Sequence, residues 1–248
     1  MVVKTVFLLT LLLIPVILPV HAYAMHIMEG FLPLWWCLCW YAVVLPFVAL
    51  GVRMIKKQAQ ENSSFKLLLG VSAGFLFVVS AMKIPSVAGS CSHPTGIGLG
   101  AILFGPLPMV VLSLIVLVFQ ALLLAHGGVS TLGANVFSMG VIGAFVSFGI
   151  YALMKKIKMP IQLSVFLAAA LGDLSTYMVT SLQLALAYPT ENNYITSFLK
   201  FLSVFAVTQL PLAALEGIVT VFVFNYLRNF QKDNIIPTYT VQKENNTR

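Results

Sequence analysis

Charged residues are scarce in this sequence of 248 residues: Asp, Glu, Lys and Arg together make up 8% of it, whereas 60% is hydrophobic. About a quarter of the residues in a soluble domain are charged, so the composition excludes an ordinary soluble protein. The mean hydropathy of +0.99 indicates a chain embedded in a bilayer. A membrane-spanning helix takes about 20 residues, so several spans and short loops account for nearly the whole length.

The sequence also lacks reactive motifs. It contains no Walker-type glycine loop, no nucleophile elbow and no paired-carboxylate motif, so we expect a protein without enzymatic activity. Any energy for transport must come from an ion gradient or from a separate ATPase. The odd number of cysteines, without zinc-type spacing, favours buried free thiols, with a thiolate ligand role for Cys91 as the alternative. The three are Cys37, Cys39 and Cys91.

The net charge of +7 is concentrated in short clusters of basic residues beside the apolar segments. Such clusters are typical of cytoplasmic loops of membrane proteins, so the sequence does not indicate a nucleic-acid partner. The three clusters are Arg53, Lys56, Lys57 and Lys66; Lys155, Lys156 and Lys158; and Arg228, Lys232, Lys243 and Arg248.

The first 24 residues have the pattern of a signal peptide. Lys4 precedes an apolar run that Pro15 and Pro19 interrupt, and the small-residue signature Ala22-Tyr23-Ala24 follows. We expect cleavage after Ala24, which gives a mature chain beginning at Met25. An uncleaved first transmembrane helix is the alternative.

The rest of the chain is predicted to be an all-α integral membrane protein with six to seven transmembrane helices. Apolar segments lie at about 33–54, 65–83, 106–125, 133–154, 161–188 and 197–227. If the mature N-terminus is extracytoplasmic and the basic clusters are cytoplasmic, one further inward crossing is needed between His93 and Gly133. The glycine-rich stretch 94–105 supplies it as a helix of about 18 Å, too short for the whole bilayer, so His93 should lie inside the bundle. We therefore expect a polytopic membrane domain at 25–230 and a cytosolic tail at 231–248.

Removal of the leader would create a metal-chelating N-terminus. The free amine of Met25, the backbone nitrogen of His26 and the His26 imidazole can close fused five- and six-membered chelate rings around one ion. Three nitrogen donors of this kind suit Ni(II), Cu(II) or low-spin Co(II) and select against magnesium and calcium. His21 leaves with the leader, so His93 and His126 remain to complete the site. We choose His93 as the further ligand and His126 as a neighbouring or entry residue.

Two acids, Asp173 and Glu216, lie well inside predicted spans. Polar groups at such depth are costly and need partners, so these acids either form hydrogen bonds between helices or take part in proton coupling. A self-sufficient proton-driven metal transporter would require the second role.

Three sequence motifs resemble those of the CbiM family. They are Met25-His26-Ile27-Met28-Glu29-Gly30-Phe31-Leu32-Pro33, Gly89-Ser90-Cys91-Ser92-His93-Pro94-Thr95-Gly96, and His126-Gly127-Gly128 with Thr131-Leu132-Gly133-Ala134-Asn135. CbiM proteins are substrate-binding (S) components of cobalt transporters of the energy-coupling-factor (ECF) class and are related to the nickel component NikM. The resemblance implies that Met25, His26 and His93 bind the ion, with Ser92, His126 and Asn135 as candidates for residues around it.

The resemblance also implies a function and partners. The implied role is capture of Co(II) for cobalamin biosynthesis, with no resident cofactor, in the cell (inner) membrane. The implied partners are a CbiQ-like transmembrane T component, a CbiO-like ATPase and a small CbiN-like accessory membrane protein. The opening His-Ile-Met-Glu-Gly is similar to the cobalt branch of the family, and uptake of nickel(II) is the alternative.

Overall fold

The structure is a computed structural model that describes residues 23–24, 26–61, 63–85, 90–190 and 193–231. Most of the predicted leader, the residue Met25 and all but the first residue of the predicted cytosolic tail lie outside these residues. The cleavage of the leader and the location of the tail therefore stay predictions.

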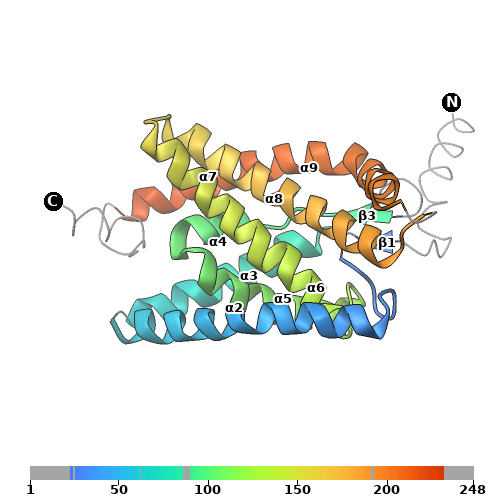
Figure 1. The fold of residues 1–248 in the computed structure, drawn as a ribbon. Helices are drawn as coiled ribbons and strands as arrows, with labels where there is room; N and C mark the ends of the chain where they lie inside the picture. Colours follow the sequence, from blue (N-terminus) through green and yellow to red (C-terminus); the bar gives the residue numbers. More distant parts are fainter. Residues whose placement is uncertain (1–22, 25, 62, 86–89, 191–192, 232–248) are drawn as a thin grey trace, which may run out of the picture.

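Long apolar helices run side by side and form an elongated bundle (Figure 1). Within the described residues, five helical segments are long and apolar enough to cross a membrane, and the shorter apolar stretch Phe65–Ala81 is a further candidate. Many large apolar side chains point outward, such as Phe222, which is 71% exposed, as expected of a surface that lipid covers. The all-α membrane fold is thus confirmed. The long elements are α2 (Leu34–Glu61), α3 (Ser63–Ala81), α5 (Pro106–Leu124), α6 (Leu132–Asn135) continued by η2 (Val136–Gly143) and α7 (Ala144–Lys156), α8 (Ile161–Ala187) and α9 (Tyr194–Gln231).

The predicted short helix exists as α4 (Ile97–Phe104), and all eight of its residues are buried in the bundle. It rises only about 12 Å, so it is shorter than the segment 94–105 that we expected and cannot cross a bilayer alone. The helix begins late because Thr95 and Gly96 belong to a loop, and Gly96 has a φ of 69°. Gly98 packs so closely on α8 that a Cβ there would lie 2.7 Å from the Cα of Ala169.

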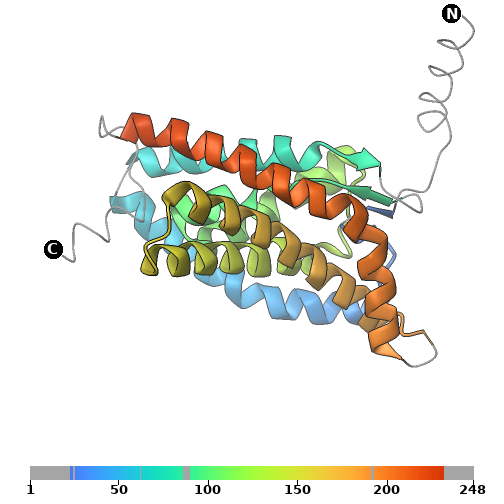
Figure 2. The same ribbon diagram turned by 90° about the horizontal axis from the view of Figure 1, so that it is seen from above.

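Irregular features interrupt some of the long helices. The segment η2 is a π-helix within the span that starts at Leu132, a feature that is frequent near functional sites. Helix α9 bends strongly (Figure 2) and contains Pro211, which has no backbone N–H to donate and disturbs the preceding turn.

A small sheet, which the sequence did not predict, brings two chain segments together at one end of the bundle. It consists of β1 (Tyr23–Ala24), β2 (Ile84–Pro85) and β3 (Ser90–Ser92), in the order β1-β3-β2. Strand β1 is parallel to β3, and β2 is antiparallel to it. The residues before Met25 therefore lie beside the residues before His93.

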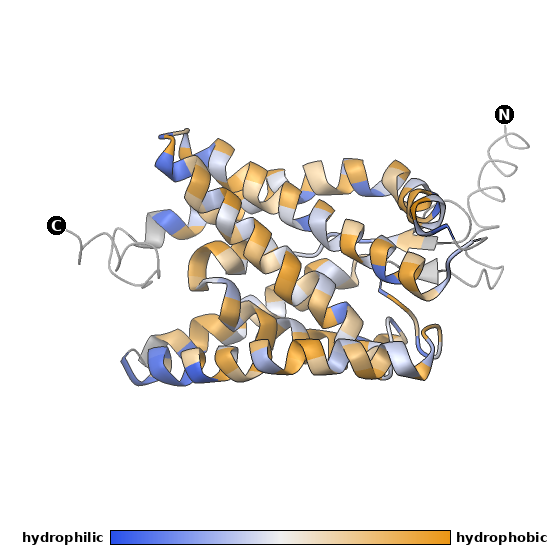
Figure 3. Cartoon of the chain, viewed as in Figure 1, coloured by the Kyte–Doolittle hydropathy of each residue, from blue (hydrophilic) through white to orange (hydrophobic). Residues whose placement is uncertain are grey.

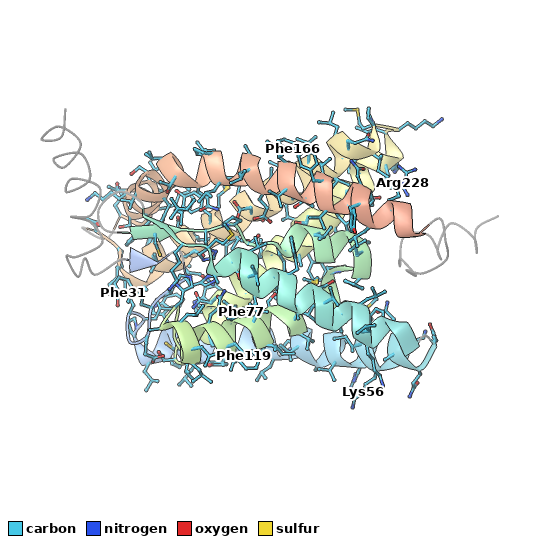
Figure 4. All side chains as sticks on the ribbon, turned by 180° about the vertical axis from the view of Figure 1, so that it is seen from behind. Phe31, Lys56, Phe77, Phe119, Phe166 and Arg228 are labelled. Atoms are coloured by element: carbon cyan, nitrogen blue, oxygen red, sulfur yellow. The ribbon has the colours of Figure 1, made fainter. Side chains whose placement is uncertain are left out.

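The described residues of the basic clusters and the segment before α2 lie at opposite ends of the bundle. Hydrophilic residues gather at the α2–α3 and α7–α8 turns (Figure 3). In Figure 4, Lys56 and Arg228 lie near one end and Phe31 near the other. This separation is the one that the orientation argument requires, although the side that faces the cytoplasm stays a prediction.

Candidate metal centre

Three imidazole rings from three separate loops meet at the sheet end of the bundle. His26 precedes α2, His93 lies between β3 and α4, and His126 lies between α5 and α6. Their ring centroids are 4.6 Å (His26 to His93), 4.8 Å (His26 to His126) and 4.9 Å (His93 to His126) apart. One candidate ligand atom from each ring lies within 4.8 Å of the others. We call these residues the histidine cluster.

The histidine cluster is closed to solvent and short of hydrogen-bond partners. The residues are 1%, 0% and 2% exposed, in sequence order, and the Nε2 atom of each has no hydrogen-bond partner among the residues that the structure describes. Buried polar atoms are usually paired, so three unpaired nitrogens in one place call for an explanation, and an ion bound by nitrogens of this cluster supplies one. Two nitrogens on one ion at about 2.1 Å each lie at most about 4.2 Å apart, so only a small contraction is needed.

The imidazoles are neutral, as metal ligands must be. Burial is the main cause in each case: it lowers the pKa of His93 to about 4 and that of His126 to about 2. Burial and the two neighbouring histidines lower the pKa of His26 well below the ordinary value of 6.5. At neutral pH each ring therefore has a lone pair on one nitrogen, available to an ion.

The chain itself orients the ring of His93. Its Nδ1 atom lies 3.0 Å from the carbonyl oxygen of Pro94. A carbonyl oxygen only accepts hydrogen bonds, so this contact requires the proton on Nδ1 and leaves Nε2 with a free lone pair. Ligating histidines commonly use the other ring nitrogen in this way.

The segment that contains His26 is held in place by helix α6. The side chain of Asn135 accepts a hydrogen bond from the Ile27 amide at 2.8 Å and donates one to the Ile27 carbonyl at 3.0 Å. The Thr131 hydroxyl donates to the same carbonyl at 2.6 Å. The backbone that follows His26 is therefore fixed on both of its polar groups.

The two glycines after His126 allow the N-terminal segment to approach. A Cβ on Gly128 would lie 2.4 Å from the Cα of Glu29, and one on Gly127 would lie 3.4 Å from the His26 Cβ. Gly127 also has a φ of 74°, which side chains rarely tolerate. The Glu29 amide donates to the Gly127 carbonyl, and the Glu29 carboxylate accepts from the Ser130 amide at 3.0 Å. The His126-Gly127-Gly128 motif thus provides the surface on which residues 26–30 pack.

The sequence-predicted residues have different fates in the structure. His26 and His93 come together as expected. Asn135 forms hydrogen bonds with the backbone of Ile27, the residue that follows His26. His126 is closer than expected, because its ring is an equal part of the histidine cluster. Ser92 is buried, but its hydroxyl pairs with Thr208 of α9 at 2.7 Å and is thereby engaged away from the rings.

Two residues that hold the site were not singled out for that role. Thr131 belongs to a recognised motif, but its hydrogen bond to Ile27 could not be read from the sequence. Glu216 was noted as a buried acid, and its carboxylate binds the loop that follows His93. Cys91 is buried but does not belong to the histidine cluster.

Comparison with known proteins identifies the family. The family model described as "Cobalt uptake substrate-specific transmembrane region", CbiM, matches residues 26–234. The "Cobalt transport protein CbiM" of Desulforamulus reducens is 61% identical over 216 residues, which cover 87% of this chain and 86% of that protein. The protein of the same name from Acetohalobium arabaticum is 54% identical over 226 residues, covering 91% of this chain and 90% of that one.

Two solved structures share the fold. The crystal structure of a truncated transition metal transporter has a TM-score of 0.73 and 25% identity, covering 83% of this chain and 99% of that one. A second transition metal transporter has the same TM-score and identity, covering 85% and 95%. From the match over most of its length and from these relatives, the chain belongs to the CbiM family of transmembrane proteins.

Proposed function

We propose that this protein is the substrate-capture subunit of an importer for Co(II), and that the histidine cluster holds the ion. The observation that carries the proposal is the meeting of three buried, neutral imidazoles from three loops around one point. The cobalt transport named for its relatives supports the choice of ion. Imidazole nitrogens suit cobalt and nickel and disfavour magnesium and calcium, which prefer oxygen.

The proposed ligands are Met25, His26 and His93. Once the leader is removed, the Met25 amine and the His26 backbone nitrogen form a five-membered chelate ring. The His26 backbone nitrogen and its Nδ1 form a six-membered one. His93 supplies the fourth nitrogen through Nε2, because its Nδ1 is engaged with Pro94. His126 lies against both rings and closes the site from the loop between α5 and α6.

Leader removal is part of this proposal. With Ala24 attached, the Met25 nitrogen is a peptide nitrogen that has lost the basicity of an amine, so the site lacks one donor. Signal-peptide processing takes place on the outer face, which puts the histidine cluster on the extracytoplasmic side and the basic clusters on the cytoplasmic side. The ion would then enter from outside the cell (inner) membrane.

Transport energy in this proposal comes from partners of the ECF class. The sequence carries no phosphate-binding motif, so ATP hydrolysis is assigned to a CbiO-like ATPase. A CbiQ-like T component and a small CbiN-like membrane protein complete the importer, which would supply cobalt for cobalamin biosynthesis. The chain itself is not an enzyme in this scheme.

Titration of the purified, processed protein with Co(II) tests the binding site. We expect His26→Ala and His93→Ala to abolish measurable binding. Cys91→Ser serves as the matched control, because Cys91 is buried near His93 but lies outside the histidine cluster, and it should bind normally. Wild-type affinity in both histidine variants would refute the proposed site. A parallel titration with Ni(II) decides between the two candidate ions.

A proton-driven transporter is the competing function, and accumulation of metal separates the two. If the chain needs ATPase partners, cells that express it alone should accumulate no Co(II), and ATP depletion should stop uptake in the complete system. Uptake by the chain alone that is insensitive to ATP and lost in Asp173→Asn would favour the competing function.

A further inference from the structure

The loop that carries His93 is bound to helix α9 by one buried carboxylate. Glu216 is 3% exposed. Its Oε2 accepts from the Thr95 amide at 2.5 Å and its Oε1 from the Gly96 amide at 3.0 Å. The Thr95 hydroxyl donates to the same carboxylate, 3.0 Å from Oε1 and 3.2 Å from Oε2. One side chain thus accepts hydrogen bonds from two consecutive residues.

These hydrogen bonds cap the N-terminus of α4. The amides at the start of an α-helix have no partner within the helix, and the N-cap residue of α4, Gly96, has no side chain to supply one. Glu216 satisfies the amide of this glycine and that of Thr95 from 120 and 121 residues away, and its negative charge lies at the helix N-terminus, where it is favourable. The start of α4 is therefore fixed by α9.

The same contacts reach the ring of His93 through a short and stiff connection. Only Pro94 separates His93 from Thr95, and its ring fixes φ and restricts the residue before it. On the other side of the loop, Ser92 is tied to Thr208 of α9. The His93 backbone is thereby held on both sides by one helix, and its ring has little freedom left.

Glu216 is supported in turn by helix α8. Its carboxyl group lies within hydrogen-bonding reach of that of Asp173, which is fully buried. A hydrogen bond between two carboxyl groups requires a proton on one of them, which Asp173 can supply as the donor. The Gln209 amide donates to the Oδ2 atom of Asp173. This arrangement leaves the Glu216 carboxylate free to accept from the loop.

We propose that Glu216 is a positioning residue for metal capture: through Thr95 and Gly96 it sets where the His93 imidazole stands relative to His26. The proposal rests on the proposed function, in which His93 binds the ion. It assigns to the buried acid of α9 a role in ligand geometry that neither general bundle stability nor proton transport would give it.

The test is Co(II) binding by Glu216→Gln in the processed chain, read by titration and by the visible d–d absorption spectrum of the bound ion. A carboxamide offers one oxygen, so its NH₂ group would face the Thr95 or the Gly96 amide and leave that donor unpaired. Loss of a partner that orients a ligand typically costs 10–100-fold in metal affinity, so we expect at least about a tenfold weaker Kd and an altered spectrum.

Two variants separate positioning from loss of stability. Thr220→Val removes a buried polar group one turn along α9 and should leave affinity and spectrum unchanged. Asp173→Asn keeps a group that can accept from Gln209 and donate to Glu216, so it should bind within about threefold of wild type, well below the 10–100-fold range. A loss in Asp173→Asn equal to that in Glu216→Gln would overturn the positioning role.

The remaining outcomes also test the positioning role of Glu216. Unchanged affinity and spectrum in Glu216→Gln would refute the inference, while Co(II) binding by the wild type would leave the proposed function intact. If Glu216→Gln does not fold, Thr95→Val carries the same test, because it removes the two hydroxyl contacts and leaves the amides. Its affinity should then fall, and a wild-type Kd in Thr95→Val would overturn the inference.

Discussion

Asn135 pairs with the backbone of Ile27 at both its amide and its carbonyl, at 2.8 Å and 3.0 Å, as a neighbouring strand would. The residue paired in this way directly follows His26. Helix α6 therefore fixes the segment whose start we propose to be the chelating terminus. The same helix continues into the π-helical segment η2, so an irregular span carries this contact.

Replacement of Asn135 by Asp should weaken metal capture. Asp keeps the size and the acceptor for the Ile27 amide, but a carboxylate cannot donate to the Ile27 carbonyl and would repel it. We expect about a tenfold or greater increase in the Co(II) Kd, measured by titration. Asn193→Asp is the matched control, since the Asn193 oxygen accepts from the Thr196 amide and Asp can do the same. Equal affinities in both variants would contradict the role of Asn135.

Gly128→Ala should displace the N-terminal segment. The added Cβ would lie 2.4 Å from the Cα of Glu29 and 2.6 Å from its amide nitrogen, so the backbone must move. We expect loss of most Co(II) binding and a lower Tm. Gly149→Ala provides the comparison, because a Cβ there meets nothing within 4 Å and alanine favours the helix by about 1 kcal/mol. A Gly128→Ala protein that binds as tightly as Gly149→Ala would show that the segment does not need this close contact.

His126→Ala should weaken binding less than His93→Ala. In the proposed ligand set His126 packs against the other two rings without being one of the donors, so its removal should cost about 10–100-fold in Kd. His93→Ala should leave no measurable affinity. Titration of both variants under the same conditions makes the comparison. An equal or larger loss in His126→Ala would make His126 a ligand.

The long spans were predictable from the sequence because they depend on local composition. Apolar runs, the basic clusters between them and the required number of crossings together gave the helices and even the short α4. The same orientation argument put His26 and His93 on one side of the bundle. These features need only the periodicity and charge of neighbouring residues.

The contacts that hold the site were not predictable in this way. Asn135 lies 108 residues from Ile27, and Glu216 lies 121 residues from Thr95. Strands of two or three residues, such as β1 and β3, are too short to leave an alternating pattern. The sequence predicted His126 only as a neighbouring or entry residue for the same reason. Its place in the histidine cluster depends on how closely residues 26–30 pack against Gly127 and Gly128 in three dimensions.

The metal-free protein should lose stability as the pH falls. Burial lowers the pKa of His93 to about 4, whereas the unfolded chain has the ordinary value of 6.5. Between these values the unfolded chain binds more protons, so the free energy of unfolding decreases as the pH drops below 6.5, by about 2 kcal/mol from His93 at pH 5. The Tm in detergent with a chelator present should fall from pH 7.5 to pH 5. The Tm of His93→Gln should fall less steeply over the same pH range. Parallel plots of Tm against pH for the two proteins would show that protonation of His93 is not the cause.

The proposed chelate makes processing of the leader a requirement for binding. Ala24 lies in β1 opposite Cys91 of β3, two residues before His93, and cleavage after Ala24 would free the Met25 amine. We expect the intact mass of the membrane-extracted protein to correspond to residues 25–248. Ala24→Leu should block cleavage, because the site needs a small residue there, whereas Ala24→Gly should be processed normally.

The affinity of the unprocessed Ala24→Leu protein then tests the amine itself. Loss of a partner that merely orients a ligand costs 10–100-fold, so loss of a donor should raise the Co(II) Kd by about 100-fold or more. A chain expressed from Met25 onward should bind like the processed wild type, because it has the same terminus. If Ala24→Leu retains its leader and still binds with wild-type affinity, the Met25 amine is not a ligand, and the three imidazoles of the histidine cluster must hold the ion by themselves.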